Sequence, residues 1–337
     1  MATLEKKPIF IVSCPRSGST LMRLILNAHP RICVPPPGFL YDYFRPYLYS
    51  YGNLASRDNL LNLAQDMLDT PPIRRWDRPP TAEQLVAEAA ENSFRGLFDA
   101  LYRCYAAREG KARWGEKSPR HGIWIDEIHE DFPGAQFVHI IRDGRDTAID
   151  ISDAEFPPES LFACAAAWSG FVQVTREAGR RLPAGCYHEI RYEELCADPA
   201  AELARLCEFL GEEFSPALLQ HHATSAAEQW SRAEVFHAKV ARPITTEFCG
   251  IHRNLSRDDR DAIEALIGST LVEFGYPCDG GARPLPERLA RKLLMFDTIT
   301  SHANAPFKID LRERRKKRLK QGIWSESDRS SQLWSVV

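Results

Sequence analysis

The segment 8–28 constrains the fold more than any other part of the sequence. Residues 8–13 are a β-branched and aromatic run that predicts a buried strand, and residues 21–28 repeat apolar side chains at helical spacing. The intervening residues 14–20, CPRSGST, are mostly small. In such a strand–loop–helix unit the backbone N–H groups of the loop and of the helix N-terminus converge on one point, which is a geometry that binds phosphate. An ordinary small-residue turn is the alternative.

Further strands with helices between them predict the fold class. Residues 136–141 and 187–192 read as buried strands, and residues 161–172 and 203–210 carry apolar side chains on one helical face. Strands that alternate with helices predict a parallel sheet covered on both faces. We therefore expect an α/β protein with a P-loop-type three-layer domain around a central parallel sheet.

Changes of pattern along the chain predict its domain organisation. The region 55–108 is expected to be a helical insertion, and the compact domain is assigned to residues 1–280. Residues 281–337 form a basic C-terminal extension, with seven Lys or Arg between residues 312 and 320. Such a tail binds an anionic partner, or it is a solvated helix or an arm that wraps around a second copy in a homodimer.

The composition excludes several classes of protein. With 337 residues and a net charge of -3, the chain has no overall attraction to nucleic acid, and none is expected as a partner. Its nine cysteines form no C-x-x-C pair, so no metal site is expected. The apolar stretch 162–172 is too short to span a membrane. The chain is therefore expected to be cytoplasmic, with reduced thiols.

The chemistry of the loop favours a phosphate over a nucleoside triphosphate with Mg²⁺. Ser17, Ser19 and Thr20 add hydroxyl donors around Gly18, and Arg16 adds a fixed positive charge. A phosphate-loop kinase shows G-x-x-x-x-G-K-[ST], in which the lysine reaches the β- and γ-phosphates. Here Gly18 is followed by a serine. A kinase nevertheless remains the enzymatic alternative, and a non-catalytic nucleotide-binding protein is a second one.

The motif P-R-S-G-S-T after an apolar strand resembles the 5'-phosphosulfate loop of sulfotransferases that use 3'-phosphoadenosine 5'-phosphosulfate (PAPS). The bacterial and tyrosyl-protein branches are the most similar. The resemblance continues through residues 21–30 and through WGEKSP at residues 114–119, and it covers most of residues 8–277. It implies an enzyme that moves a sulfuryl group from PAPS to a hydroxyl or amine and releases 3',5'-PAP. No metal is required for this transfer.

Other segments that resemble the family imply further donor contacts. Residues 140–146, IIRDGRD, are similar to its second signature, whose leading arginine, here Arg142, holds the 3'-phosphate through a bidentate guanidinium. By the same resemblance Tyr192 lies beside the adenine, although a tyrosine packed at a strand end is the alternative. Residues 250–254 resemble a late segment that closes over the nucleotide, with His252 in place of tryptophan, and this assigns Arg253 to the cofactor.

Two departures from the family pattern stand out. A serine usually follows the 3'-phosphate arginine by eight positions, but here that position is Asp150 and the nearest serine is Ser152. Because a carboxylate beside a phosphate is unfavourable, either the local geometry differs or Asp150 turns away. In the tyrosyl-protein branch a catalytic glutamate follows the His-Pro segment, whereas this chain has prolines at 35–37.

The catalytic roles are assigned by charge and by place in the motifs. We expect Arg16 to stabilise the leaving group, Lys117 to reach the transferring sulfuryl group and Glu116 to act as the base. A structural ion pair of Glu116 with Lys117 or Arg145 is the alternative. His121 is the second candidate base, because a neutral imidazole is suited to proton abstraction near pH 7.

The acceptor cannot be named from the sequence. The aromatic stretch 39–51 follows the first helix and either lines an acceptor pocket or belongs to the core. Small molecules, glycans, lipids and peptides all remain open as acceptors.

Overall fold

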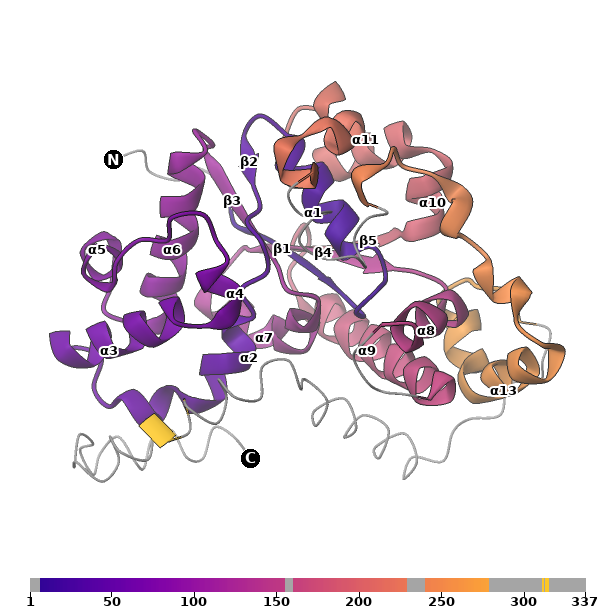
Figure 1. Cartoon of the computed structure of the whole chain (residues 1–337), viewed down its shortest axis with the longest axis horizontal. Coiled ribbons are helices and arrows are strands. Elements are labelled where there is room, and N and C mark those ends of the chain that lie inside the picture. Colours follow the sequence, from indigo (N-terminus) through magenta and orange to yellow (C-terminus); the bar gives the residue numbers. More distant parts are fainter. Residues whose placement is uncertain (1–6, 155–159, 229–239, 279–310, 312, 315–337) are drawn as a thin grey trace.

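The fold is a parallel sheet between layers of helices (Figure 1). The computed structural model describes residues 7–154, 160–228, 240–278, 311, 313 and 314. The sheet has five strands in the order β2-β3-β1-β4-β5, and every pairing is parallel. The strands are β1 (Ile9–Ser13), β2 (Ile32–Cys33), β3 (Arg113–Lys117), β4 (Gln136–Ile141) and β5 (Tyr187–Arg191). The expected α/β class with a central parallel sheet is confirmed.

Three of these strands, β1, β4 and β5, lie where the sequence predicts them. β5 ends at Arg191, one residue before the predicted end, because Tyr192 begins a helix. β2 and β3 were not predicted. All five residues of β3 are buried although three of them are charged, so the strand lacks an apolar signature.

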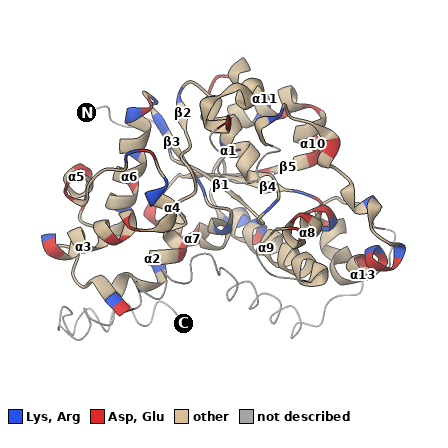
Figure 2. Ribbon diagram, in the orientation of Figure 1, with Lys and Arg blue, Asp and Glu red and all other residues tan. Residues whose placement is uncertain are grey.

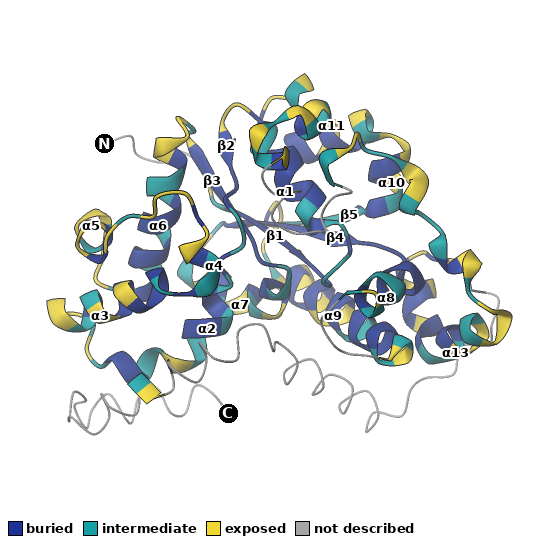
Figure 3. Cartoon of the chain, in the orientation of Figure 1, coloured by how far each residue is buried: buried dark blue, intermediate teal, exposed yellow. Residues whose placement is uncertain are grey.

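The two faces of the sheet bury different side chains of β1, because successive residues of a strand point to opposite faces. Ile9 and Ile11 pack with helices α1 (Ser19–Ala28) and α11 (Pro199–Leu210). Phe10 and Val12 pack with helices α2 (Leu40–Phe44), α3 (Arg57–Leu68), α6 (Phe94–Arg108) and α7 (Ile125–Asp131). A third cluster joins Cys14, which follows β1, to helices α8 (Gly144–Ser152), α9 (Leu161–Arg181) and α13 (Arg257–Glu273). Figure 3 shows β1 to β4 buried along their length, whereas the edge strand β5 is mostly half-buried and the helices expose their outer faces.

The helices of the described chain are placed as follows. Those of eight or more residues are α1 (Ser19–Ala28), α3 (Arg57–Leu68), α6 (Phe94–Arg108), α8 (Gly144–Ser152), α9 (Leu161–Arg181), α11 (Pro199–Leu210) and α13 (Arg257–Glu273). Shorter ones are α2 (Leu40–Phe44), α4 (Pro71–Arg74), α5 (Ala82–Glu88), α7 (Ile125–Asp131) and α10 (Tyr192–Ala197). The 3₁₀ turns that matter for the site are Pro119–Trp124, Thr246–Phe248 and Ile251–Asn254. Within the described residues, no helix is long and apolar enough to cross a membrane.

Helices α3 to α6 fill the region 55–108, where the sequence predicts a helical insertion, and they lie together on one side of the sheet (Figure 1). The aromatic stretch 39–51 contributes mainly to the core here, since Tyr41, Phe44 and Tyr51 are all at most 1% exposed. The outer helices α3 and α13 carry charges of both signs (Figure 2).

The C-terminal extension lies largely outside the described residues, but part of it contacts the helical insertion. Leu311 is buried in the cluster beneath α3 and α6. Arg314 donates a hydrogen bond of 2.8 Å to the Asp66 carboxylate. At least Leu311 and Arg314 of the tail therefore pack against the chain itself, and a domain boundary at residue 280 remains a proposal.

Candidate active site

The loop between β1 and α1 turns sharply around two residues with positive φ. Gly18 has φ 99° and directly precedes α1, and Arg16 has φ 69°, an uncommon value for a residue with a Cβ. Ser17 and Ser19 are buried in the turn. The Ser17 hydroxyl has no hydrogen-bond partner in the described part of the chain. The loop therefore holds a buried donor that the described protein groups leave unused.

Tyr192 lies directly against this loop. A Cβ added to Gly18 would lie 2.5 Å from Cδ2 of the Tyr192 ring, so only glycine allows this approach. The Arg142 guanidinium stands 5.1 Å from the centroid of the same ring. The carboxyl ends of parallel strands meet at one edge of the sheet, which explains why residues after β1, β4 and β5 converge here.

Arg142 is held by the backbone of two loops. Its Nη1 donates to the Arg16 carbonyl (3.1 Å), and its Nη2 donates to the Phe248 carbonyl (2.8 Å). Nη1 also donates a hydrogen bond to the Asp150 carboxylate and forms an ion pair with it. Asp150 therefore does not turn away from the arginine. Ser152 does not take the place of the missing serine, because its hydroxyl donates to the Ile149 carbonyl.

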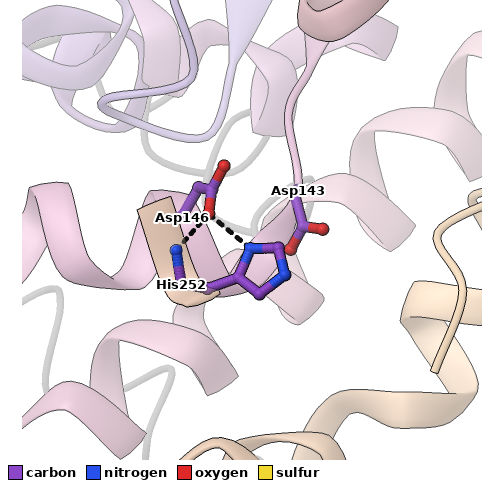
Figure 4. Close-up of side chains that lie close together, drawn as sticks. All are labelled: Asp143, Asp146 and His252. Carbon is purple, nitrogen blue, oxygen red and sulfur yellow. Dashed lines mark hydrogen bonds and ion pairs between the residues drawn. The ribbon is translucent and has the colours of Figure 1, made fainter. Parts of the chain in front are cut away.

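Asp146 fastens the segment 250–254 to the start of α8. Its carboxylate accepts from the Gly250 amide (2.6 Å), the His252 amide (2.9 Å) and His252 Nδ1 (2.6 Å), as Figure 4 shows for His252. Burial alone would raise the pKa of Asp146, but the bonds from His252 and the charge of Arg142 lower it below its usual value. Arg253 is exposed, with its guanidinium against Gly250, and its assignment to the donor remains a proposal.

Asp143, Asp146 and His252 offer ligand atoms within 4.8 Å of one another, which raises the question of a metal. Both carboxylates already have partners. Asp143 accepts from Nε and Nη2 of Arg145 at 3.0 and 2.7 Å, and a guanidinium so close repels a cation. We assign Asp146 and His252 to holding the 250–254 segment in place, and Asp143 to holding Arg145.

Glu116 and Lys117 end β3 and point to opposite faces of the sheet. Lys117 pairs in register with Ile11, and its Nζ lies 3.3 Å from the Thr20 hydroxyl at the start of α1. Lys117 is therefore placed at the loop. Glu116 pairs in register with Phe10, whose side chain faces the helical insertion.

Glu116 is fully buried and forms a close pair with His121. His121 Nδ1 lies 2.9 Å from its Oε2, and the Ser118 hydroxyl donates to its Oε1. Burial and the charge of Glu116 together raise the pKa of the buried Tyr102 well above its usual value. The alternative partner Arg145 instead bonds Asp143 and Glu264. The two candidate bases are thus one hydrogen-bonded unit.

The pair should make stability depend on pH. Burial alone would lower the pKa of His121, but the charge and hydrogen bond of Glu116, with Asp42, raise it above the ordinary 6.5. The stabilisation is therefore complete below that value and is lost as pH rises through the raised pKa. We expect the free energy of unfolding of wild type minus that of His121→Asn to fall above about pH 6.5 in urea titrations.

His188 provides a control of opposite sign. Burial and the charge of Arg205 lower its pKa, so the stability difference between wild type and His188→Asn should rise as the pH approaches 6.5 from below. A wild-type minus His121→Asn difference that stays constant or grows with pH would contradict the ionised pair.

Comparisons with known proteins identify the family of the chain. The chain belongs to the Sulfotransferase family, whose model matches residues 8–216. It is therefore a sulfotransferase, an enzyme of the transferase class. The family and the enzyme class expected from the loop motif are confirmed.

Two relatives are named as sulfotransferases, and one solved structure shares the fold. The chain is similar to omega-hydroxy-beta-dihydromenaquinone-9 sulfotransferase Stf3 of Mycobacterium bovis, at 29% identity over 65% of this chain and 67% of that protein. It is 23% identical to protein-tyrosine sulfotransferase A of Caenorhabditis elegans over 71% of this chain and 59% of that protein. The sulfotransferase domain of the Synechococcus PCC 7002 olefin synthase has the same fold, with a TM-score of 0.54, 21% identity and coverage of 82% of this chain and 98% of that domain.

Of the residues assigned from the sequence, the structure gathers the loop 14–20, Lys117, Arg142 and Tyr192 at one edge of the sheet. Glu116 lies on the same strand as Lys117 but on the opposite face. Asp146 was not predicted as a functional residue, although it is the last residue of the IIRDGRD segment. Its partner His252 is too distant in sequence for any local pattern to reveal the contact.

Proposed function

We propose that this enzyme transfers the sulfuryl group of PAPS to a hydroxyl or amine of an acceptor and releases 3',5'-PAP. The observation that carries the proposal is the convergence of the loop 14–20 with Arg142 and Tyr192. A strand–loop–helix turn suits the 5'-phosphosulfate, a buried arginine suits the 3'-phosphate, and a tyrosine between them suits the adenosine.

Unused donors at this edge of the sheet support an anionic ligand. Among the described residues, the buried Ser17 hydroxyl and the buried Nε of Arg142 have no hydrogen-bond partner. Buried polar groups are normally satisfied, so donors left over in one place are expected where a ligand supplies the acceptors. A nucleotide with two separate phosphate positions would use both.

In the proposed reaction an acceptor oxygen attacks the sulfur while the bond to the bridging oxygen of the 5'-phosphate breaks. Arg16 stabilises the negative charge that develops on the bridging oxygen, and Lys117 holds the sulfuryl oxygens. The acceptor proton passes to the Glu116–His121 pair, with Glu116 as the first choice of base. All bonds broken and formed are then accounted for without a metal.

A phosphate-loop kinase fits the site less well. In such enzymes the hydroxyl that follows the loop lysine binds Mg²⁺. Here Ser19 replaces the lysine, and the Lys117 ammonium lies 3.3 Å from the Thr20 hydroxyl. A cation already at this position disfavours a divalent metal, because like charges repel.

A hydroxyl is the favoured acceptor. The two relatives compared above are named for a protein tyrosine and for an omega-hydroxy compound, and both groups are hydroxyls. A direct test incubates the protein with PAPS and a library of phenols, alcohols, amines, glycans and peptides and detects sulfated products by mass spectrometry. Hydrolysis of ATP without use of PAPS would favour the kinase, and binding of PAP without any product would favour a non-catalytic protein.

The 3'-phosphate contact can be tested by itself. If the Arg142 guanidinium binds that phosphate, Arg142→Ala should weaken the binding of 3',5'-PAP by roughly 1.5–3 kcal/mol, the scale of hydrogen bonds to charged groups. The affinity for 5'-AMP, which lacks the group, should hardly change. Calorimetry on the four protein and ligand combinations measures both effects. An equal loss for AMP and PAP would show that Arg142 supports the fold of the site and does not read the phosphate.

A further inference from the structure

Arg142 has a fixed position, but its guanidinium already has an anionic partner within the protein. It is only 3% exposed, and the Arg16 and Phe248 carbonyls hold it from two sides. The Tyr192 ring lies against it. These contacts fix the plane of the guanidinium, so an incoming anion must meet it where it already stands.

The anionic partner is the Asp150 carboxylate. Asp150 lies in the last turn of α8 and bonds Nη1 of Arg142. Burial alone would lower the pKa of Arg142, but the charge and hydrogen bond of Asp150, with Tyr192 and Asp146, raise it above its usual value. Nε remains buried without a partner among the described residues. The positive charge of Arg142 is thus balanced by Asp150, while its Nε donor has no partner among the described residues.

We propose that Asp150 is a specificity-determining residue that competes with the 3'-phosphate for Arg142. This inference rests on the proposed function. To bind a 3'-phosphorylated nucleotide, the Asp150 carboxylate must leave Nη1, because a carboxylate and a phosphate on one guanidinium repel each other. Its side chain is 13% exposed, so it lies near enough to the surface to move into solvent. A nucleotide without the 3'-phosphate leaves the pair intact.

The competition has a consequence for turnover. When the product PAP begins to dissociate, Asp150 recovers the guanidinium and replaces the departing phosphate, so no buried charge is left unpaired. The carboxylate therefore shortens the lifetime of the product complex. In a site with a neutral residue at this position, the phosphate would leave Arg142 without a counter-charge.

The test uses Asp150→Asn in the full chain, since the amide keeps the shape of the side chain and removes only the charge. We expect PAP to bind roughly tenfold or more tightly and to dissociate more slowly, the scale of one hydrogen bond between charged groups. The affinity for 5'-AMP should hardly change. Calorimetry and stopped-flow displacement of PAP measure these quantities, and thermal unfolding verifies that the variant is folded.

Asp153→Asn is the matched control. Asp153 follows α8 directly and is exposed, so its replacement removes the same charge from the same helix end without touching Arg142. Asp150→Ser is the second variant and should act like Asp150→Asn. Unchanged or weaker PAP binding in both Asp150 variants, or equal tightening in Asp153→Asn, would overturn the inference.

The test separates this inference from the proposed function. If wild-type protein sulfates an acceptor from PAPS but the Asp150 variants bind PAP no more tightly, only the competition is wrong. If neither wild type nor variants bind PAP more tightly than AMP, the 3'-phosphate site itself is wrong, and the proposed function falls with it.

Discussion

Arg16→Ala should lower kcat by ~10²-fold or more, the usual loss when one preorganised stabiliser of a developing charge is removed. The binding of PAP should weaken much less. The reason is that the bridging oxygen carries its full negative charge only as the S–O bond breaks, so the guanidinium contributes most in the transition state. Single-turnover rates with saturating PAPS measure the first quantity, and calorimetry measures the second.

The backbone at this position makes alanine the appropriate replacement. Arg16 has φ 69°, where any residue with a Cβ is strained, and alanine keeps that Cβ. The strain is therefore similar in both proteins, and the difference reports the guanidinium. Arg16→Lys retains the charge and should recover part of the rate. Equal kcat values for Arg16→Ala and wild type would show that this residue has no part in the chemical step.

The parts of the fold predicted from the sequence are those with a local signature. β1 and β4 are runs of buried apolar residues, and the small residues after β1 allow only a tight turn before α1. β3 has no such signature, because three of its five buried residues are charged and some of their partners are distant in sequence. Arg113, for example, bonds the Lys7 and Leu210 carbonyls, which lie far from it in sequence.

The candidate site was predictable where residues of the motifs themselves make the contacts at the edge of the sheet. Lys117 and Arg142 both stand at the edge of the sheet that the motifs imply. The pairing of Arg142 with Asp150 was not predictable. The sequence shows a carboxylate at an unfavourable position, but only the structure shows that the helix brings it back to the same guanidinium.

Glu116→Gln should reduce turnover by ~10²- to 10⁴-fold, the contribution typical of a positioned general base. The amide cannot accept the proton of the acceptor, but it has the size of the carboxylate and can still bond His121 and Ser118. We therefore expect the affinity for PAP to stay close to that of wild type and the acidic limb of the pH–rate profile to flatten. Steady-state rates across the pH range, with calorimetry on PAP, measure these effects.

His121→Asn is the matched variant, because His121 Nδ1 lies 2.9 Å from Glu116 Oε2 and the two side chains are hydrogen-bonded. If Glu116 is the base, the imidazole positions it and stabilises its charge, so the histidine change should cost less than the glutamate change and should shift the pH profile without removing its acidic limb. The opposite ranking, with activity lost only in His121→Asn, would make His121 the base and Glu116 the residue that orients it. The ranking of the two variants therefore decides which member of the pair receives the proton.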